Sequence, residues 1–290
     1  MERIANIEEF ERMENLFYSH FVPQEEEGDC FSFDIIKRED NRDSGFLSPS
    51  SGLKIASAKK VLRNLNENHT RLFMNNGYSS LEDSPERQRF FNSNILHFIA
   101  ITDKYEDSLY HSQLVSNYTL LLTQYLGIED REFLTDIERG ALLHDIGKIG
   151  IPQSILRKPG SLTYEEKETI KYHPLFGYEM IKEFDFLTKE AQVVLYHHEQ
   201  YDGSGYPYSL IGKEIPLEAR IFAIADTLDA ITSDRPYREG TSFEDAREEI
   251  ERNSGTQFDP LLVDIFLSIP LEKLQQIKES HETYSSTLIH

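Results

Sequence analysis

Half of the chain's ten histidines fall between residues 111 and 198, and each lies on, or at the end of, the apolar stripe of a predicted helix. A single histidine in such a place is more often a hydrogen-bonded core residue than a ligand. Several ionisable groups that converge on one interior are costly, however, unless a metal ion takes up their charge and lone pairs. The residues that would converge are His111, His144, His173, His197 and His198, together with Asp145 and Asp226. Imidazole and carboxylate donors suit Fe, Mn or Zn better than Ca or Mg, so the pattern predicts a metal centre of that type.

Two adjacent pairs, His144-Asp145 and His197-His198, indicate more than one ion. Neighbours on a helix point about 100° apart, so a pair in the middle of a helix cannot easily serve a single metal. Either each pair straddles two ions or the helix ends at the pair, and the carboxylate of Asp145 could bridge two ions. We interpret the spacing as a multinuclear site. Two ions a few ångströms apart hold a bridging hydroxide and an in-line leaving oxygen, the usual solution for phosphoester hydrolysis.

Two features close to these residues suit a phosphate-containing ligand. Lys148 comes one turn after His144; it is either a surface lysine favoured by the helix dipole or a cation that stabilises charge on a phosphate oxygen. The segment His198–Pro207 contains two glycines and a proline, which predicts a turn, and its Tyr206 offers a flat face to a base.

Acidic side chains outnumber basic ones, 51 to 30, for a formal charge of −21. This balance argues against a nucleic-acid polymer or an anionic membrane as the main partner, because both select basic surfaces. Residues 93–290 hold 34 of the acidic and 18 of the basic side chains, a net of −16. Arg235 and Arg238 stand out in that acidic context, either as surface ion pairs or as donors to an anionic ligand.

The single cysteine, Cys30, excludes an internal disulfide framework and fits a reducing compartment. No apolar run reaches the roughly 18 residues that a membrane helix needs. We therefore expect a soluble, cytoplasmic protein with no membrane span.

The elements that must position these residues are helices. Helical periodicity predicts helices over residues 105–126, 132–144 and 217–233. Thr163 and Glu166 form a capping-box pattern at the start of another helix, and Pro174 suits the first turn of the next. Thr188 is the predicted cap of the segment that ends at His197 and His198.

The pattern changes at about residue 92, which divides the chain into two predicted domains. Residues 93–290 are predicted to be all-α. Residues 1–92 mix strand-like and helix-like stretches and predict a small α+β domain, with a linker near residues 75–92 that is rich in Asn, Gly, Ser, Asp and Pro.

Over residues 105–240 the sequence resembles the HD-GYP family, a branch of the HD phosphohydrolase superfamily. An isolated His-Asp pair is a weak signal, whereas an ordered set of motifs is a strong one. The set comprises His144-Asp145-Ile146-Gly147-Lys148, His173-Pro174-x-x-Gly177, His197-His198-Glu199-x-x-Asp202-Gly203-x-Gly205-Tyr206-Pro207, Asp226-x-x-Asp229-Ala230 and Arg235-Pro236-Tyr237.

The resemblance implies a mainly α protein whose HD-type helical domain hydrolyses cyclic di-GMP to pGpG and/or GMP by a metal-bridging hydroxide. It implies two or three divalent ions, iron or manganese. The metal ligands carried over are His111, His144, Asp145, His173, His197, His198 and Asp226, and the substrate-binding residues are Lys148, Tyr206, Arg235 and Arg238. Asp145 and Lys148 would be catalytic.

Three positions depart from the family pattern. Some members bind a third metal through an acidic residue four positions before the first histidine, where Glu is expected and this chain has Asp107. Arg238 stands where Lys is common, which keeps the charge but changes its geometry. Ser209 replaces the glycine that is usual two residues after Pro207. None of the seven principal ligands is lost.

Two other functions remain open from the sequence. The chain could be a cyclic di-GMP receptor or interaction protein with little or no turnover, or an HD hydrolase that acts on another phosphoester. A second copy of the chain and a signalling protein are both candidate partners, and the resemblance suggests a regulatory role for residues 1–92.

Overall fold

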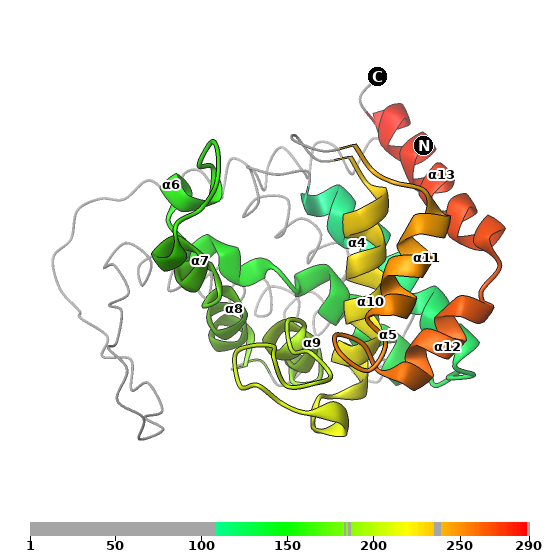
Figure 1. Cartoon of the computed structure of the whole chain (residues 1–290), viewed down its shortest axis with the longest axis horizontal. Coiled ribbons are helices and arrows are strands. Elements are labelled where there is room, and N and C mark those ends of the chain that lie inside the picture. Colours follow the sequence, from blue (N-terminus) through cyan, green and yellow to red (C-terminus); the bar gives the residue numbers. More distant parts are fainter. Residues whose placement is uncertain (1–107, 183, 185–186, 235–238, 289–290) are drawn as a thin grey trace, which may run out of the picture. The chain divides into compact units, whose positions relative to one another are not determined.

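The computed structural model describes residues 108–182, 184, 187–234 and 239–288 (Figure 1). Within these ranges the chain is helical and contains no strand, only two isolated bridges. The predicted all-α domain is confirmed for this part of the chain. The α+β domain predicted for residues 1–92, with its linker, lies outside the described residues.

Most of the helices are shorter than five turns and are joined by short connections. In chain order they are α4 (Ser108–Tyr125), α5 (Arg131–Leu143), the 3₁₀ turn η1 (Ile146–Gly150), α6 (Gln153–Leu156), α7 (Tyr164–Ile170), α8 (His173–Ile181), α9 (Glu190–Tyr196), the 3₁₀ turn η3 (Gly212–Glu214), α10 (Leu217–Thr232), α11 (Phe243–Arg252), α12 (Pro260–Ser268) and α13 (Leu271–Leu288).

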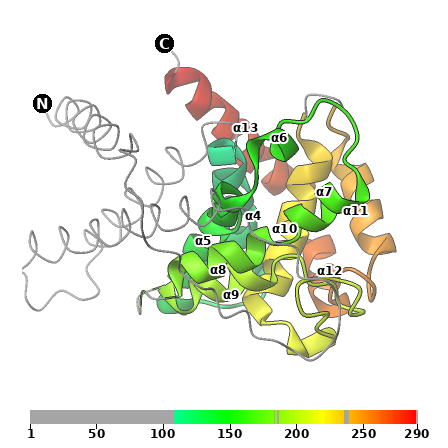
Figure 2. The same ribbon diagram turned by 90° about the vertical axis from the view of Figure 1, so that its left-hand side faces the viewer.

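The hydrophobic core lies where α4, α5 and α10 pack together. Leu114 of α4, Ile137 of α5 and Phe222 of α10 are fully buried in it. In both views the pair α8 and α9 and the pair α11 and α12 lie on opposite sides of α10 (Figure 1 and Figure 2). α10 therefore lies between the pair α8 and α9 on one side and the pair α11 and α12 on the other.

Local signals in the sequence account for several helix boundaries. Asp130 accepts a hydrogen bond of 2.8 Å from the amide of Phe133 and caps α5. The capping box of Thr163 and Glu166 is confirmed at the start of α7. Pro174 lies in the first turn of α8, as predicted.

The predicted cap at Thr188 is wrong. Helix α9 begins at Glu190 and its N-cap is Lys189, whose side chain makes no capping hydrogen bond. Lys189 pairs instead with Glu132 of α5, at 2.5 Å between Nζ and Oε1. This exposed ion pair links the start of α9 to α5.

A close backbone approach joins η1 to the start of α8. A Cβ atom at Gly147 would lie 1.9 Å from the carbonyl oxygen of His173, so no other residue fits there without a shift of backbone. This approach brings the turn that carries Asp145 against the helix that begins at His173.

Among the described residues, no helix is both long enough and apolar enough to cross a lipid bilayer.

Candidate metal centre

Six elements bring the predicted ligands to one place, and helix ends supply most of them. His111 lies in the first turn of α4, and Asp226 lies in α10. The remaining ligands stand at or next to helix ends: His144 is the C-cap of α5, Asp145 precedes η1, His173 is the first residue of α8, His197 is the C-cap of α9 and His198 follows it. Because the chain turns at these points, residues adjacent in sequence can face a common centre.

His111, His144 and Asp226 form a first group, which we call group one. One ligand atom from each lies within 4.8 Å of the other two. Nε2 of His111 is 3.4 Å from Oδ1 of Asp226, and the His111 and His144 rings meet edge to face at 5.3 Å. Two imidazoles and a carboxylate in this arrangement match the donor set of Fe, Mn or Zn.

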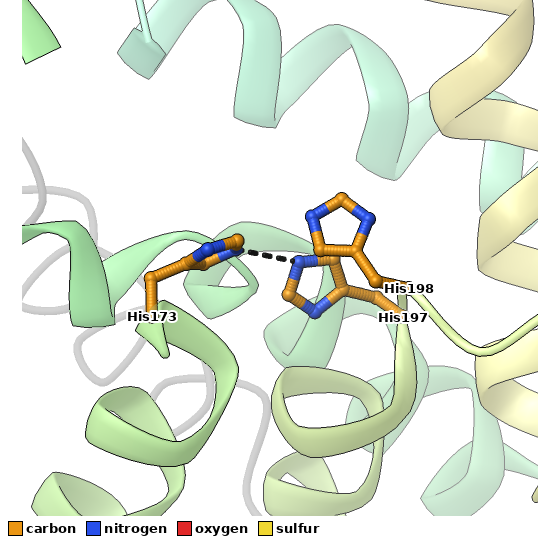
Figure 3. Close-up of side chains that lie close together, drawn as sticks. All are labelled: His173, His197 and His198. Carbon is orange, nitrogen blue, oxygen red and sulfur yellow. Dashed lines mark hydrogen bonds between the residues drawn. The ribbon is translucent and has the colours of Figure 1, made fainter. Parts of the chain in front are cut away.

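His173, His197 and His198 form a second group, which we call group two, with ligand atoms again within 4.8 Å of one another. Nε2 of His173 and Nε2 of His197 are 3.1 Å apart, and Figure 3 shows the three rings gathered together. Of the two arrangements that the sequence left open for the pair His197-His198, the structure has the helix ending there. Both residues therefore belong to the same group.

Asp145 joins the two groups. Its Oδ2 lies 3.1 Å from Nε2 of His144 in group one, and its Oδ1 lies 3.2 Å from Nε2 of His173 in group two. The side chain is largely buried. A carboxylate placed this way can bridge two neighbouring ions, which is the arrangement expected from the adjacent pair His144-Asp145.

Three of the histidines are fixed by their own helical turns. In each of them Nδ1 donates to the carbonyl oxygen three residues earlier, which directs Nε2 towards the centre. These contacts are His144 to Ala141 at 2.8 Å, His173 to Ile170 at 2.8 Å and His197 to Val194 at 2.9 Å.

The protonation states of the acidic donors suit a metal ion. Burial alone would raise the pKa of Asp145, but His144 and Lys148 hold it well below its ordinary value. Burial also acts to raise the pKa of Asp226, but His111 outweighs burial and lowers the pKa to about 2. Both carboxylates are therefore ionised at neutral pH, as coordination requires.

Two histidines of group two, His197 and His198, are neutral imidazoles at neutral pH. Burial, followed by the neighbouring histidines, holds the pKa of His197 well below its ordinary value. Burial and the nearby His173 lower the pKa of His198 to about 3. A metal ion binds clustered neutral imidazoles, so the ligand atoms that group two gathers within 4.8 Å of one another fit such an ion.

Asp229 is a residue that the sequence analysis named only as part of a motif. Its side chain is 1% exposed, and its Oδ2 lies 2.5 Å from Nδ1 of His111. Ser233 donates to the other carboxylate oxygen at 2.6 Å. Asp226 and Asp229 are three residues apart on α10 and so share a helix face, which is the signal that could have identified Asp229. Asp229 orients His111 through Nδ1, in the same way that backbone carbonyl groups orient His144, His173 and His197.

His111 has an unusually high pKa for a candidate metal ligand. Burial lowers its pKa, but Asp226 and Asp229 outweigh burial and raise the pKa to about 10. Without a metal, this histidine carries a proton between two carboxylates. A metal ion held at Nε2 of His111 would take the place of that proton, and Asp229 would hold Nδ1.

Lys148 and Tyr206 lie beside the centre. The Nζ atom of Lys148 is 2.7 Å from Oδ2 of Asp145. The ring of Tyr206 lies 4.7 Å from that of His198 with a tilt of 30°, and the ammonium group of Lys171 is 5.8 Å from the Tyr206 ring. Burial raises the pKa of the Tyr206 hydroxyl, so this group stays protonated. Three further predicted site residues lie outside the described residues: Asp107, Arg235 and Arg238.

Glu199 is a second residue whose role the sequence did not reveal. It is 3% exposed, and its two carboxylate oxygens accept hydrogen bonds from the amides of Tyr208 at 2.7 Å and Leu210 at 3.0 Å. Between these two residues Ser209 has a φ of +56°, a backbone region in which glycine is favoured. Glu199 thus holds the loop that places Tyr206 on His198.

The fold and the site together define a helical domain that carries two neighbouring groups of histidine and aspartate side chains, each able to hold a metal ion. The family model described as "HD domain" matches residues 98–262, and the chain belongs to this family. The match covers all seven principal ligands, and it confirms the predicted resemblance at the level of the HD domain.

Several curated relatives are similar to the chain. It is 40% identical over 191 residues to a cyclic di-GMP phosphodiesterase response regulator of Xanthomonas campestris, covering 65% of this chain and 50% of that protein. It is 39% identical over 182 residues to a cyclic di-GMP phosphodiesterase of Thermotoga maritima, covering 61% and 49%. A 3'3'-cGAMP-specific phosphodiesterase of Vibrio cholerae is 37% identical over 159 residues, covering 54% and 30%. The chain thus spans about half the length of the first two relatives, and less of the third.

Proposed function

We propose that the chain is a metal-dependent phosphodiesterase that hydrolyses cyclic di-GMP to pGpG and/or GMP. The observation that carries the proposal is the position of Asp145, whose two oxygens face His144 in group one and His173 in group two. A bridged pair of sites is the arrangement that phosphoester hydrolysis commonly uses. The names of two relatives, both cyclic di-GMP phosphodiesterases, support the choice of substrate.

Iron or manganese is the proposed metal, as the resemblance to the HD-GYP family implies, and the imidazole and carboxylate donors fit either ion. Group one would hold one ion, group two a second, and Asp145 would contact both. When bound, the ions supply Lewis acidity towards the phosphoester and lower the pKa of the attacking water. A third ion at Asp107 stays a prediction.

The chain's own residues would then position the substrate and balance its charge. Lys148 provides a cation beside Asp145, where negative charge on a phosphate oxygen would develop during attack. Tyr206 offers an aromatic face to a guanine base. Arg235 and Arg238 would hold the second phosphate or the other base, which remains a prediction from their place in the family motif.

The first experiment follows product formation by the full chain. Protein purified without oxygen and loaded with Fe(II) or Mn(II) is incubated with cyclic di-GMP, and pGpG and GMP are separated by chromatography. The double variant His144→Ala, Asp145→Ala should form no product, while Asp264→Asn, at an exposed position on α12, should match the wild type. Absence of product from metal-loaded wild type would contradict the proposal.

Two other functions are decided by the same assay. The similarity to a 3'3'-cGAMP-specific phosphodiesterase makes that dinucleotide a second candidate substrate. Parallel reactions with equal concentrations of the two dinucleotides compare their rates of hydrolysis directly. A receptor with little or no turnover would bind cyclic di-GMP at micromolar or lower concentration and release no product.

A further inference from the structure

The C-terminal helix α13 lies beyond the part of the chain that matches the HD domain family, which ends at residue 262. It nevertheless belongs to the same core. Leu274 is 1% exposed, Ile277 packs against the buried cluster, and α13 contacts both α4 and α11. Figure 2 shows α13 behind the upper end of α4. Two polar contacts extend from this helix towards group one of the metal centre.

The first contact holds the C-terminal end of α10. Nζ of Lys278 donates to the carbonyl oxygen of Thr232, the last residue of α10, at 2.6 Å. Carbonyl groups at a helix end lack an intrahelical donor, and a lysine there also complements the helix dipole. The next residue, Ser233, donates to Asp229, which in turn holds His111. Lys278 thus fixes the helix end from which this chain of hydrogen bonds starts.

The second contact lies at the start of α4. The ring of His281 meets that of Tyr110 edge to face, with centroids 4.5 Å apart and planes at 84°. His281 is only 8% exposed. Tyr110 directly precedes the ligand His111, so a shift of Tyr110 would move the backbone that carries the ligand. α13 therefore contacts α10 and α4, the two helices that contribute His111 and Asp226.

We propose that α13 is a positioning element for group one: through Lys278 and His281 it holds α4 and α10 at the spacing that lets His111 and Asp226 share a metal ion. This inference rests on the proposed metal centre. Group two is carried by the start of α8 and the end of α9, on the other flank of α10 (Figure 1). The two groups should accordingly respond differently to changes in α13.

The test measures Mn(II) affinity by calorimetry on the full chain, with the groups separated by two backgrounds. His198→Ala weakens group two and reports on group one, and Asp226→Ala weakens group one and reports on group two. Lys278→Met removes the donor to Thr232. Lys273→Met is the matched control, because Lys273 is exposed on the same helix and stacks on Tyr125, at the far end of α4.

In the His198→Ala background, Lys278→Met should weaken Mn(II) binding by about 3- to 10-fold, less than the 10- to 100-fold typical when a direct partner of a ligand is lost. Lys273→Met should change it by less than about twofold. Lys278→Arg, which keeps a donor, should restore the affinity. In the Asp226→Ala background, Lys278→Met should leave affinity unchanged. His281→Leu is the second variant and should act on group one in the same way.

Circular dichroism of the metal-free variants checks that each one is folded. Equal Mn(II) affinity of Lys278→Met and Lys273→Met in the His198→Ala background would overturn the role of α13 while leaving the metal centre intact. An equal loss in both backgrounds would mean general destabilisation and would also overturn it. Wild type that binds no Mn(II) or Fe(II) would overturn the proposed function and this inference together.

Discussion

Asp145 presents its two oxygens to two different histidines and also receives the ammonium group of Lys148. A buried carboxylate with so many cationic or imidazole neighbours remains ionised, as its lowered pKa indicates. The negative charge of Asp145, which pairs with Lys148, could also bind two metal ions. At the scale of single residues, Asp145 is therefore the position on which both halves of the centre depend.

Replacing Asp145 should disable both groups together. We expect Asp145→Asn, which keeps the shape and loses the charge, to weaken binding of both ions by more than about 100-fold, above the range for residues that only orient a ligand. Metal content after purification with Mn(II), measured by elemental analysis, checks this, with Asp264→Asn as the exposed control. Retention of one full equivalent of metal would show that Asp145 serves a single group.

We expect Asp229 to act on the proposed centre through His111, because its Oδ2 lies 2.5 Å from Nδ1 of that histidine. Asp229→Asn keeps an acceptor for Nδ1 and should weaken metal binding at group one by about 10-fold, whereas Asp229→Ala, which leaves Nδ1 without that acceptor, should approach 100-fold. Mn(II) titration of the two variants beside Asp264→Asn measures the difference. If Asp229→Ala bound metal as the wild type does, Asp229 would have no positioning role.

At the scale of elements, the centre depends on where helices stop. α5 ends at Leu143 and α9 ends at Tyr196, so each adjacent pair of candidate ligands lies at the C-terminal end of its helix. η1 then packs against α8 through Gly147, where a side chain would collide with backbone. The loop after His198 is held by Glu199, which sets the place of Tyr206.

That loop contains a residue with a strained backbone, and the effect of removing the strain on stability can be measured. Ser209 has a φ of +56°, which disfavours residues with a side chain by roughly 1–2 kcal/mol. Ser209→Gly should raise the free energy of unfolding by up to about 1 kcal/mol, because glycine's larger unfolded-state entropy and the loss of the Ser209 hydrogen bond to Gly205 offset part of the gain. Denaturant unfolding checks this. Ser254→Gly, at a position without a positive φ, should destabilise the protein; stabilisation there would contradict the reasoning.

At the scale of the whole described domain, stability and metal binding are linked. Because the donors of both groups are assembled only in the folded chain, a metal ion that binds them stabilises the native state, by about 2.7 kcal/mol at a free concentration of 100 times the dissociation constant. Removing the metal with a chelator should lower the melting temperature of the wild type. The double variant His144→Ala, Asp145→Ala should show no such dependence, and equal shifts in both proteins would argue against a specific site.

A buried carboxylate away from the centre gives the domain a pH dependence. Burial raises the pKa of Glu190 to about 7, against an ordinary value of 4.5, although Arg139 lies 3.4 Å away. The folded state then binds more protons than the unfolded state between these values. The contribution of Glu190 to stability is fully present below pH 4.5 and is lost as pH rises towards 7.

Glu190→Gln should therefore raise the free energy of unfolding at pH 8 by about 1–3 kcal/mol, and should change it little at about pH 4.5. Chemical denaturation across this pH range measures both. Glu248→Gln, at an exposed position on α11, is the matched control and should leave the profile unchanged. A Glu190→Gln profile parallel to that of the wild type would show that Glu190 does not titrate in this window.

Several features followed from the sequence because their causes are local. The capping box at Thr163, the proline in the first turn of α8 and the helix ending at Thr232, one residue before its predicted end, are set by neighbours within a few residues. The seven candidate ligands could likewise be identified without a structure. Imidazole and carboxylate groups that recur on apolar stripes are costly to bury unless they bind an ion or one another.

Only the tertiary structure decided how those ligands are shared. The division into group one and group two, and the bridging place of Asp145, depend on where α5 and α9 end and how α4 and α10 cross. Asp229 belongs to a sequence motif, but its partner His111 became apparent only in the structure, where two helices far apart in the chain meet. The predicted start of α9 differed from the observed one by a single residue, since the N-cap is Lys189 and not Thr188.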